Sequence, residues 1–241
     1  MRNMSTKKLL IIKCGDSFPE LVTRKGNFED WIIAGSGLKP AEVFTVNVEK
    51  NDSLPAPYEV TGVIITGSHA MVTEHRPWSE RTATWLARAV GKVPILGICY
   101  GHQLLGYALG GKVADNPTGR EMGMVDIEFS ATAAEDKLLG GFSPAITAPV
   151  SHKQSLVELP AGAVFLARSA REPHQAFRFG DNAWGLQFHP EFDAEITCSY
   201  IDYCHDLLVD EGQNPDQLKQ GCHDSGTGTA ILQHFRELIQ A

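Results

Sequence analysis

A cysteine flanked by two glycines lies where a predicted strand meets a predicted helix. The apolar run 93–98 is typical of a short buried strand, and 100–109 has the pattern of a helix that glycines end. Between them, Gly97, Cys99 and Gly101 form a Gly-x-Cys-x-Gly sequence, the thiol form of the nucleophile elbow, whose small flanking residues permit a sharp turn. A helix N-terminus favours thiolate over thiol, and the thiolate is the reactive species. The sequence therefore predicts a nucleophilic cysteine, with a buried core cysteine as the alternative.

A histidine and a glutamate follow another predicted strand, 184–188. Residues two apart in an extended chain point the same way, so His189 and Glu191 can share one face, with Pro190 stiffening the backbone between them. His189 could accept the proton of Cys99 and return it to a leaving group, while Glu191 orients the ring and stabilises the imidazolium. Alone, this segment could simply pack at a strand end. Together with the cysteine elbow, it predicts a Cys-His-Glu triad.

Strands and helices are expected to alternate before the elbow. We expect strands at 8–14, 42–48 and 62–66, helices around 28–34 and 77–90, and a loop over 16–26. This alternation is typical of a parallel sheet covered on both faces, with ligands bound at the carboxyl ends of its strands. Gly15, Gly67 and Cys99 all follow such ends, so we expect them to lie around one site.

Short β-like segments with frequent turns follow the elbow helix, at 111–115, 124–129, 146–151, 163–168, 176–179 and 184–188. We interpret them as a small antiparallel extension, because no Gly/Ser/Pro-rich or charged linker divides the chain. From Asp193 onward we expect helix, with a last helix at about 229–240 and one apolar face made by Ile196, Tyr200, Tyr203, Leu207 and Leu208. Residues 1–241 are thus expected to form a single α/β domain with a mostly parallel central sheet flanked by helices.

Composition restricts the class of partner and the compartment. The chain has 241 residues, enough for one substantial core, and a formal net charge of -8 with scattered Lys and Arg, which predicts neither nucleic-acid nor anionic-membrane binding. The apolar run 9–12 is too short for a signal peptide, and no run approaches a membrane span. Five irregularly spaced cysteines favour a reducing compartment. We therefore expect a cytoplasmic protein whose partner is a small molecule or another protein.

Other cysteines and histidines do not predict a metal site. The tail residues lack the Cys-x-x-Cys pairing of a structural zinc site, so we expect no metal and no cofactor; they are Cys198, Cys204, His205, Cys222 and His223. Four further histidines are expected to be surface or packing residues, namely His69, His75, His102 and His174.

The two motifs together resemble those of the class I glutamine amidotransferases. Gly97-Ile98-Cys99-Tyr100-Gly101-His102-Gln103 and His189-Pro190-Glu191 are similar to the segments that carry the triad in that family's glutaminase domains, and the resemblance covers about residues 9–203. It implies a flavodoxin-like fold. It also implies that Cys99 attacks the side-chain amide of L-glutamine, that ammonia leaves with a proton from His189, and that water hydrolyses the γ-glutamyl thioester to glutamate.

The resemblance also implies roles for other residues. The backbone N–H groups of Gly67 and Tyr100 match the family's oxyanion hole, where one donor is typically worth about 2.7 to 4 kcal/mol in the transition state. Gln103 matches a glutamine that contacts the substrate, and Ser151-His152 resembles a segment whose backbone holds the α-amino and carboxylate groups. The chain departs from the family at Gly67-Ser68-His69, where many members have Gly-Gly-Pro.

Two segments, 65–68 and 76–78, are most similar to those of GMP-synthase-like members. Because the sequence ends at Ala241 without a synthetase domain, we expect a free-standing glutaminase that passes ammonia to an acceptor or a synthetase partner. One alternative is a γ-glutamyl peptidase that acts on glutathione-like compounds. Another is a non-catalytic regulatory protein, which the complete triad argues against. DJ-1/PfpI-like proteins also have a cysteine elbow in a related fold, but the His-Pro-Glu segment favours the amidotransferase.

Overall fold

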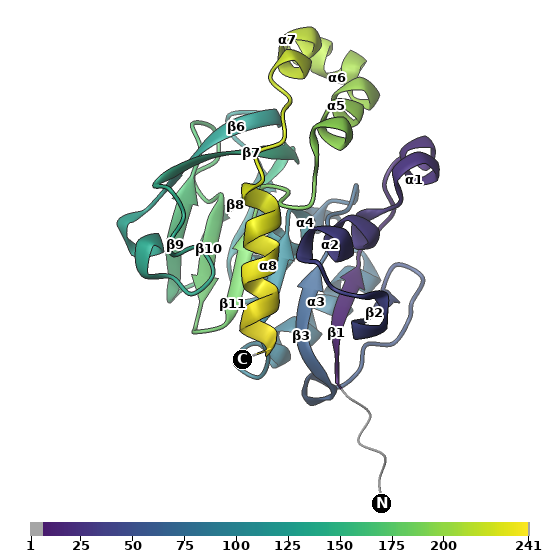
Figure 1. The fold of residues 1–241 in the computed structure, drawn as a ribbon, viewed down its shortest axis with the longest axis vertical. Helices are drawn as coiled ribbons and strands as arrows, with labels where there is room; N and C mark the ends of the chain where they lie inside the picture. Colours follow the sequence, from purple (N-terminus) through teal and green to yellow (C-terminus); the bar gives the residue numbers. More distant parts are fainter. Residues whose placement is uncertain (1–6, 241) are drawn as a thin grey trace, which may run out of the picture.

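Nine strands form one continuous sheet in the computed structural model, which describes residues 7–240 (Figure 1). Their order is β2-β1-β3-β4-β11-β10-β9-β6-β7. The first five are parallel: β2 (Val43–Asn47), β1 (Lys8–Lys13), β3 (Val60–Ile65), β4 (Ile95–Ile98) and β11 (Ala183–Leu186). The other four continue it as antiparallel neighbours: β10 (Ala176–Phe179), β9 (Ala163–Arg168), β6 (Glu121–Phe129) and β7 (Ala145–His152). β5 (Lys112–Asp115) and β8 (Gln154–Glu158) form a separate antiparallel pair.

Eight α-helices surround the sheet within the described range. They are α1 (Pro19–Lys25), α2 (Phe28–Ser36), α3 (Pro77–Ala89), α4 (Tyr100–Ala108), α5 (Ala194–Tyr203), α6 (His205–Asp210), α7 (Pro215–Gln220) and α8 (Thr227–Gln240). Short 3-10 turns lie at Pro40–Glu42, Pro57–Glu59, Val72–Glu74 and Ala131–Glu135.

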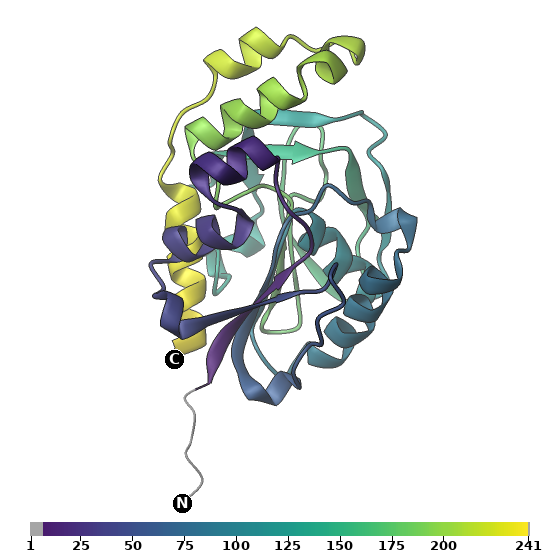
Figure 2. The ribbon, with the colours of Figure 1, turned by 90° about the vertical axis from the view of Figure 1, so that its right-hand side faces the viewer.

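Side chains at alternate positions of β1 are buried on the two opposite faces of the parallel half of the sheet. Leu9 and Ile11 lie in an apolar cluster with residues of α2 and α8, whereas Leu10 and Ile12 lie in a second cluster with residues of α3 and α4. Figure 2 shows α8 and α2 on one side of the sheet and α3 on the other. The predicted α/β class is therefore confirmed, and the antiparallel strands extend the same sheet through β10. Residues 1–6 and 241 of the predicted domain lie outside the described residues.

The predicted loop over 16–26 is wrong, because this segment contains helix α1. Pro19 occupies the first turn with Glu20, and Gly26 ends the helix with a φ of 80°. Proline at the start and glycine after the end are ordinary helix signals. They are easily missed here because only Leu21 is buried, which leaves no apolar periodicity. Strand β8 was also not predicted.

The predicted apolar face of the tail is wrong at two positions. Ile196, Tyr200 and Leu208 are buried, but Tyr203 and Leu207 are 40% and 43% exposed. The reason is that α5 ends before Cys204 and a separate helix, α6, starts at His205, so one helical repeat does not run through both.

A helical cap covers the end of the sheet at which the parallel strands finish. Leu21 of α1 and Phe28 and Trp31 of α2 form a third apolar cluster with Ile196 and Tyr200 of α5. Both ribbon views show α5, α6 and α7 beyond the carboxyl ends of β1 and β3 (Figures 1 and 2). The cap therefore closes one side of the region where the sequence predicts the site.

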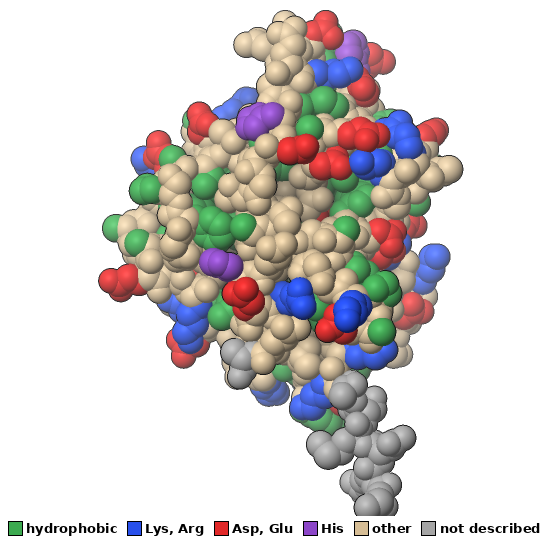
Figure 3. All heavy atoms as spheres, viewed as in Figure 1, with side chains coloured by type: hydrophobic (Ala, Val, Ile, Leu, Met, Phe, Trp, Pro, Cys, Tyr) green, Lys and Arg blue, Asp and Glu red, His purple; other side chains and the backbone are tan. Residues whose placement is uncertain are grey.

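Charges of both signs are interspersed on the α8 face of the molecule (Figure 3). Within residues 7–240, no helix combines the length and the apolarity that a bilayer crossing needs. The same range contains no group of three or more His, Cys, Asp or Glu residues arranged to hold a metal ion.

Truncation of Phe235 tests the position of α8. Its ring is fully buried and meets Trp184 of β11 edge-on with centroids 6.3 Å apart. We expect Phe235→Ala to lower the free energy of unfolding by about 3–5 kcal/mol, measured by urea denaturation. The exposed Gln233→Ala in the same helix should change it by less than about 0.5 kcal/mol. Equal effects of the two changes would contradict the packing of α8 on the sheet.

Candidate active site

Cys99 lies on a strained turn between β4 and α4. Its φ of 50° and ψ of -102° are unusual for a residue with a side chain. A Cβ on Gly97 would lie 2.4 Å from the Gly101 carbonyl oxygen, and a Cβ on Gly101 would lie 2.5 Å from that of Ile65. Both glycines are therefore required by close backbone approach, which presses the start of α4 against β3 and β4.

Pairing of β4 with β11 brings the second motif to the cysteine. Ile98 is in register with Leu186, and the Cys99 N–H donates to the Leu186 carbonyl oxygen at 2.8 Å. The chain then leads to His189, whose imidazole is close enough to Cys99 for that residue to raise its pKa. His189 Nδ1 lies 2.8 Å from Glu191 Oε1, and both side chains are buried. The three residues of the predicted triad are thus brought together.

The surroundings of His189 favour its protonated form. Burial alone lowers the pKa of the imidazole, but the Glu191 carboxylate and Cys99 outweigh burial and raise the pKa to about 10. The ring of Phe192 stacks on the imidazole with centroids 3.9 Å apart, which fixes its plane. His189 is therefore held as an imidazolium at neutral pH, oriented by one carboxylate and one aromatic ring.

Of the two predicted oxyanion donors, Tyr100 follows Cys99 directly in the chain and Gly67 lies next to the His189 ring. Tyr100 is the first residue of α4, so its N–H has no acceptor within the helix. Gly67 follows β3, and a Cβ there would lie 3.2 Å from His189 Cε1. The Ser68 hydroxyl accepts from the Ala70 N–H at 3.0 Å, so this side chain folds onto its own loop. The backbone of the Ser68 loop therefore runs beside the imidazole.

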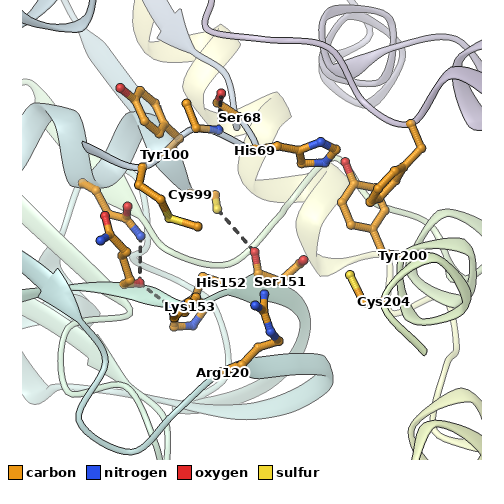
Figure 4. A pocket seen from close by; sticks show the side chains of 15 residues that line it. Ser68, His69, Cys99, Tyr100, Arg120, Ser151, His152, Lys153, Tyr200 and Cys204 are labelled. Atoms are coloured by element: carbon orange, nitrogen blue, oxygen red, sulfur yellow. Dashed lines mark hydrogen bonds between the residues drawn. The ribbon is translucent and has the colours of Figure 1, made fainter. Parts of the chain in front are cut away.

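A pocket of about 290 Å³ opens above Cys99 (Figure 4). The Cys99 thiol donates to the carbonyl oxygen of Ser151 at 3.7 Å. The lining comes from the elbow, the Ser68 loop, the end of β7 and helix α5, and consists of Phe18, Ser68, His69, Ala70, Met71, Cys99, Tyr100, Gln103, Arg120, Ser151, His152, Lys153, Gln154, Tyr200 and Cys204.

The predicted substrate-binding residues line this pocket, but parts of their side chains are already bound. Gln103 Nε2 donates to the Gln154 carbonyl oxygen at 2.8 Å and to Gln187 Oε1 at 2.9 Å, so Oε1 is the atom of Gln103 left for a ligand. The His152 ring contacts the Gln154 carbonyl oxygen and Glu121 Oε2, each at 3.0 Å. A ligand next to His152 is therefore expected to contact the backbone of this residue rather than its ring.

Several lining residues were not predicted from the sequence. They are Phe18, Ala70, Met71, Arg120, Lys153, Gln154, Tyr200 and Cys204. His69, expected at the surface or in packing, also faces the pocket and lies 4.5 Å from the Phe18 ring, centroid to centroid. Burial and the nearby charge of His189 lower the pKa of His69. One feature of the sequence could have indicated that His69 lies at the site. It is the third residue of the segment Gly67-Ser68-His69, where many family members have Gly-Gly-Pro.

A family model described as Glutamine amidotransferase class-I matches residues 11–201. The match spans most of the sequence, and the chain belongs to the class I glutamine amidotransferase family. The solved glutamine amidotransferase of Thermotoga maritima has the same fold: it superposes with a TM-score of 0.75 at 21% identity, covering 98% of this chain and 99% of that one.

The sequence relatives include GMP synthases. The GMP synthase [glutamine-hydrolyzing] of Porphyromonas gingivalis is 34% identical over 151 residues, which are 60% of this chain and 28% of that protein. A GMP synthase [glutamine-hydrolyzing] subunit of Saccharolobus solfataricus is 46% identical over 103 residues, which are 42% of this chain and 52% of that subunit. The match thus spans about a quarter to a half of these relatives. The predicted resemblance to GMP-synthase-like members is confirmed.

Glu191→Gln tests the electrostatics of His189. Without the carboxylate, we expect the pKa of the imidazole to fall from about 10 toward its ordinary value of about 6.5, as measured by NMR titration of the ring. Because folding raises the pKa of His189, the imidazolium contributes its full stabilisation of the fold below about pH 6.5. That contribution is lost as the pH rises to about 10. The native protein should therefore lose its stability advantage over the variant across this interval. An advantage that grew with pH would contradict the assignment.

Gly101→Ala tests the elbow. The added methyl group would meet the Ile65 backbone, so we expect a loss of about 1–3 kcal/mol in the free energy of unfolding and slower alkylation of Cys99 by iodoacetamide. Gly221→Ala is the matched control, because its φ is -79° and its nearest contact is 3.3 Å away. Equal stability of the two variants would argue against close packing at the elbow.

Proposed function

We propose that this chain hydrolyses the side-chain amide of L-glutamine to glutamate and ammonia through a γ-glutamyl thioester on Cys99. The observation that carries the proposal is the arrangement of Cys99 on its strained elbow, beside an imidazole that Glu191 holds at 2.8 Å. A thiol, a base and an orienting carboxylate are the components of nucleophilic acyl transfer. Membership of the class I family supports the same chemistry.

In the first half-reaction, Cys99 reacts as the thiolate, its proton held by the His189 imidazolium, and its Sγ attacks the amide carbon of glutamine. The carbonyl oxygen becomes an oxyanion that the N–H groups of Gly67 and Tyr100 stabilise. The His189 imidazolium gives its Nε2 proton to the amide nitrogen, the carbon–nitrogen bond breaks, and ammonia leaves. In the second half-reaction, neutral His189 takes a proton from water, whose oxygen attacks the thioester. The carbon–sulfur bond breaks, glutamate forms, and the thiolate and imidazolium are restored.

The amino-acid end of glutamine would lie over the end of β7. Gln103 Oε1 is an acceptor and therefore suits the α-ammonium group, because Nε2 is already bound within the protein. The backbone of Ser151 and His152 borders the same part of the pocket. These contacts hold the amide carbon against the thiol, which lowers the entropic cost of the attack.

We further propose that ammonia passes to an acceptor, supplied by a synthetase partner. The GMP synthase relatives, one of which is itself named as a subunit, support this idea. All five cysteines are free thiols, which supports a reducing compartment such as the cytoplasm.

Assays with L-glutamine and, in parallel, glutathione test the proposal. We expect the native chain to release ammonia and glutamate from glutamine. Cys99→Ala should lower kcat by at least about 10⁴-fold. Cys198→Ala, a cysteine outside the pocket, should leave kcat within about two-fold of native, because surface changes away from a site are usually small in effect.

Two outcomes would overturn the proposal. A much higher kcat/KM for glutathione would make the enzyme a γ-glutamyl peptidase, in which an amine replaces ammonia as the leaving group. Absence of turnover for both substrates, together with no reaction of Cys99 with a glutamine-mimicking diazoketone, would favour a regulatory role without catalysis.

A further inference from the structure

Two cysteines outside the candidate active site, Cys198 and Cys222, meet at the carboxyl end of one short helix. Cys198 belongs to α5, and Cys222 follows the end of α7 by two residues. The Cys198 thiol donates to the Lys219 carbonyl oxygen at 3.9 Å, and the Cys222 thiol donates to the Leu218 carbonyl oxygen at 3.7 Å. The two sulfurs therefore contact carbonyl groups of adjacent residues, which brings them to the same place.

An ion pair and apolar packing hold α7 against α5. Lys219 Nζ lies 2.7 Å from Asp202 Oδ1, and Asp202 is one helical turn beyond Cys198. Lys219 thus contacts α5 both through its ammonium group and through its carbonyl oxygen. Leu218 and Cys222 also pack against the apolar cluster of the helical cap. The two thiols are therefore held together by a fixed helix contact.

The acidity of Cys222 also reflects the presence of Cys198. Burial and the neighbouring Cys198 thiol raise the pKa of Cys222 to about 12. Cys222 therefore keeps its proton at neutral pH, and by itself it reacts slowly because the thiolate is the nucleophilic form. The pKa of Cys204, at the end of α5, responds instead to burial, Arg120 and Glu211. The close pair is thus Cys198 with Cys222.

Exposure and the number of nearby ligands decide what this pair can do. Both thiols are partly exposed and within reach of a small solute, whereas Cys14 is fully buried. A structural zinc site needs four ligands, and the part of the chain that the structure describes contains no cluster of three candidate ligands. The pair is therefore suited to oxidation rather than to metal binding.

We propose that Cys198 and Cys222 form a redox modification site, at which hydrogen peroxide converts the two thiols into a reversible disulfide. The Cys198 thiolate attacks one peroxide oxygen, the oxygen–oxygen bond breaks, and Cys198 becomes a sulfenic acid. The released hydroxide takes up the proton that Cys198 lost and becomes water. The Cys222 sulfur then attacks the sulfenic sulfur, the sulfur–oxygen bond breaks, and a second water leaves with the Cys222 proton. In total, the two thiols lose two electrons and two protons, and one peroxide is reduced to two waters.

The disulfide closes a loop of chain that includes α6 and α7 (Figure 1). In the chain-entropy model, such a cross-link stabilises the folded segment by restricting its unfolded states. Tyr200 and Cys204 belong to this loop and line the pocket above Cys99, so the bond fastens one wall of the candidate active site. Because the thiols are already neighbours, the bond holds that wall in its present position.

Peroxide treatment of the full chain, followed by mass spectrometry of unreduced peptides, tests the proposal. The Cys99→Ala variant is used so that the nucleophile does not compete for the oxidant, which leaves four of the five cysteines. We expect a linkage between Cys198 and Cys222, the loss of two thiols, and recovery of both with dithiothreitol. In this background, Cys198→Ser and Cys222→Ser should each abolish the linkage. Cys204→Ser is the matched control and should retain it.

Amide hydrogen exchange measures what the bond does to the helices. In the disulfide form, exchange in α6 and α7 should slow by at least about ten-fold relative to the reduced form, because opening of the closed loop is restricted. Exchange in α3, outside the loop, should stay within about two-fold. Cys222→Ser treated with peroxide in the same way should show no slowing in α6 or α7.

Three results would overturn the proposal. They are the absence of a linkage between Cys198 and Cys222, a linkage that uses Cys204 in place of either, and unchanged exchange in α6 and α7 after the linkage has formed. The test is independent of the proposed function, because it is read in a variant that lacks the Cys99 thiol. Glutamine hydrolysis by the native chain can therefore fail while the disulfide forms, and the reverse is equally measurable.

Discussion

The position of Cys99 depends on backbone contacts that only glycine permits. With no side chain at positions 97 and 101, α4 starts directly against β3 and β4, and the chain turns through a residue with a φ of 50°. Such a conformation costs about 1–3 kcal/mol. Buried side chains on both sides of the turn, such as Ile98 and Leu104, offset that cost. The strain thus keeps the sulfur at the pocket, because the packed elements around it leave the turn no room to relax.

The imidazole next to the thiol is held by a different balance of forces. Burying an imidazolium and a carboxylate together costs several kcal/mol per ion in solvation, and their attraction repays this only in good geometry. Here the 2.8 Å contact between His189 and Glu191 is combined with the stacked Phe192 ring. The pair is therefore better understood as a device for orientation than as a source of stability.

The sequence was sufficient to predict the fold and the site where the local residue pattern and the chemistry of the residues agree. The apolar runs of β1, β3 and β4 and the glycines beside Cys99 predicted the parallel half, and His189 with Glu191 followed from their spacing. Helix α1 was missed because it buries one residue, and the break between α5 and α6 was missed because no proline or glycine marks it at Cys204. Arg120, Lys153 and His69 belong to no local pattern. Their place in the pocket results from strand register and from the helical cap, which single-sequence periodicity does not describe.

The position of β11 between β4 and β10 has a consequence for how the protein is made. Strand β4 and its cysteine emerge from the ribosome long before residues 183–186, so one edge of β4 remains unpaired while the intervening strands are synthesised. An open apolar edge invites wrong pairing, and contacts between distant segments slow folding. Until β11 inserts, the thiol also has neither His189 nor Glu191 beside it. The protein therefore gains its reactive centre in the same step that closes the middle of its sheet, and an incomplete chain carries a cysteine without its base.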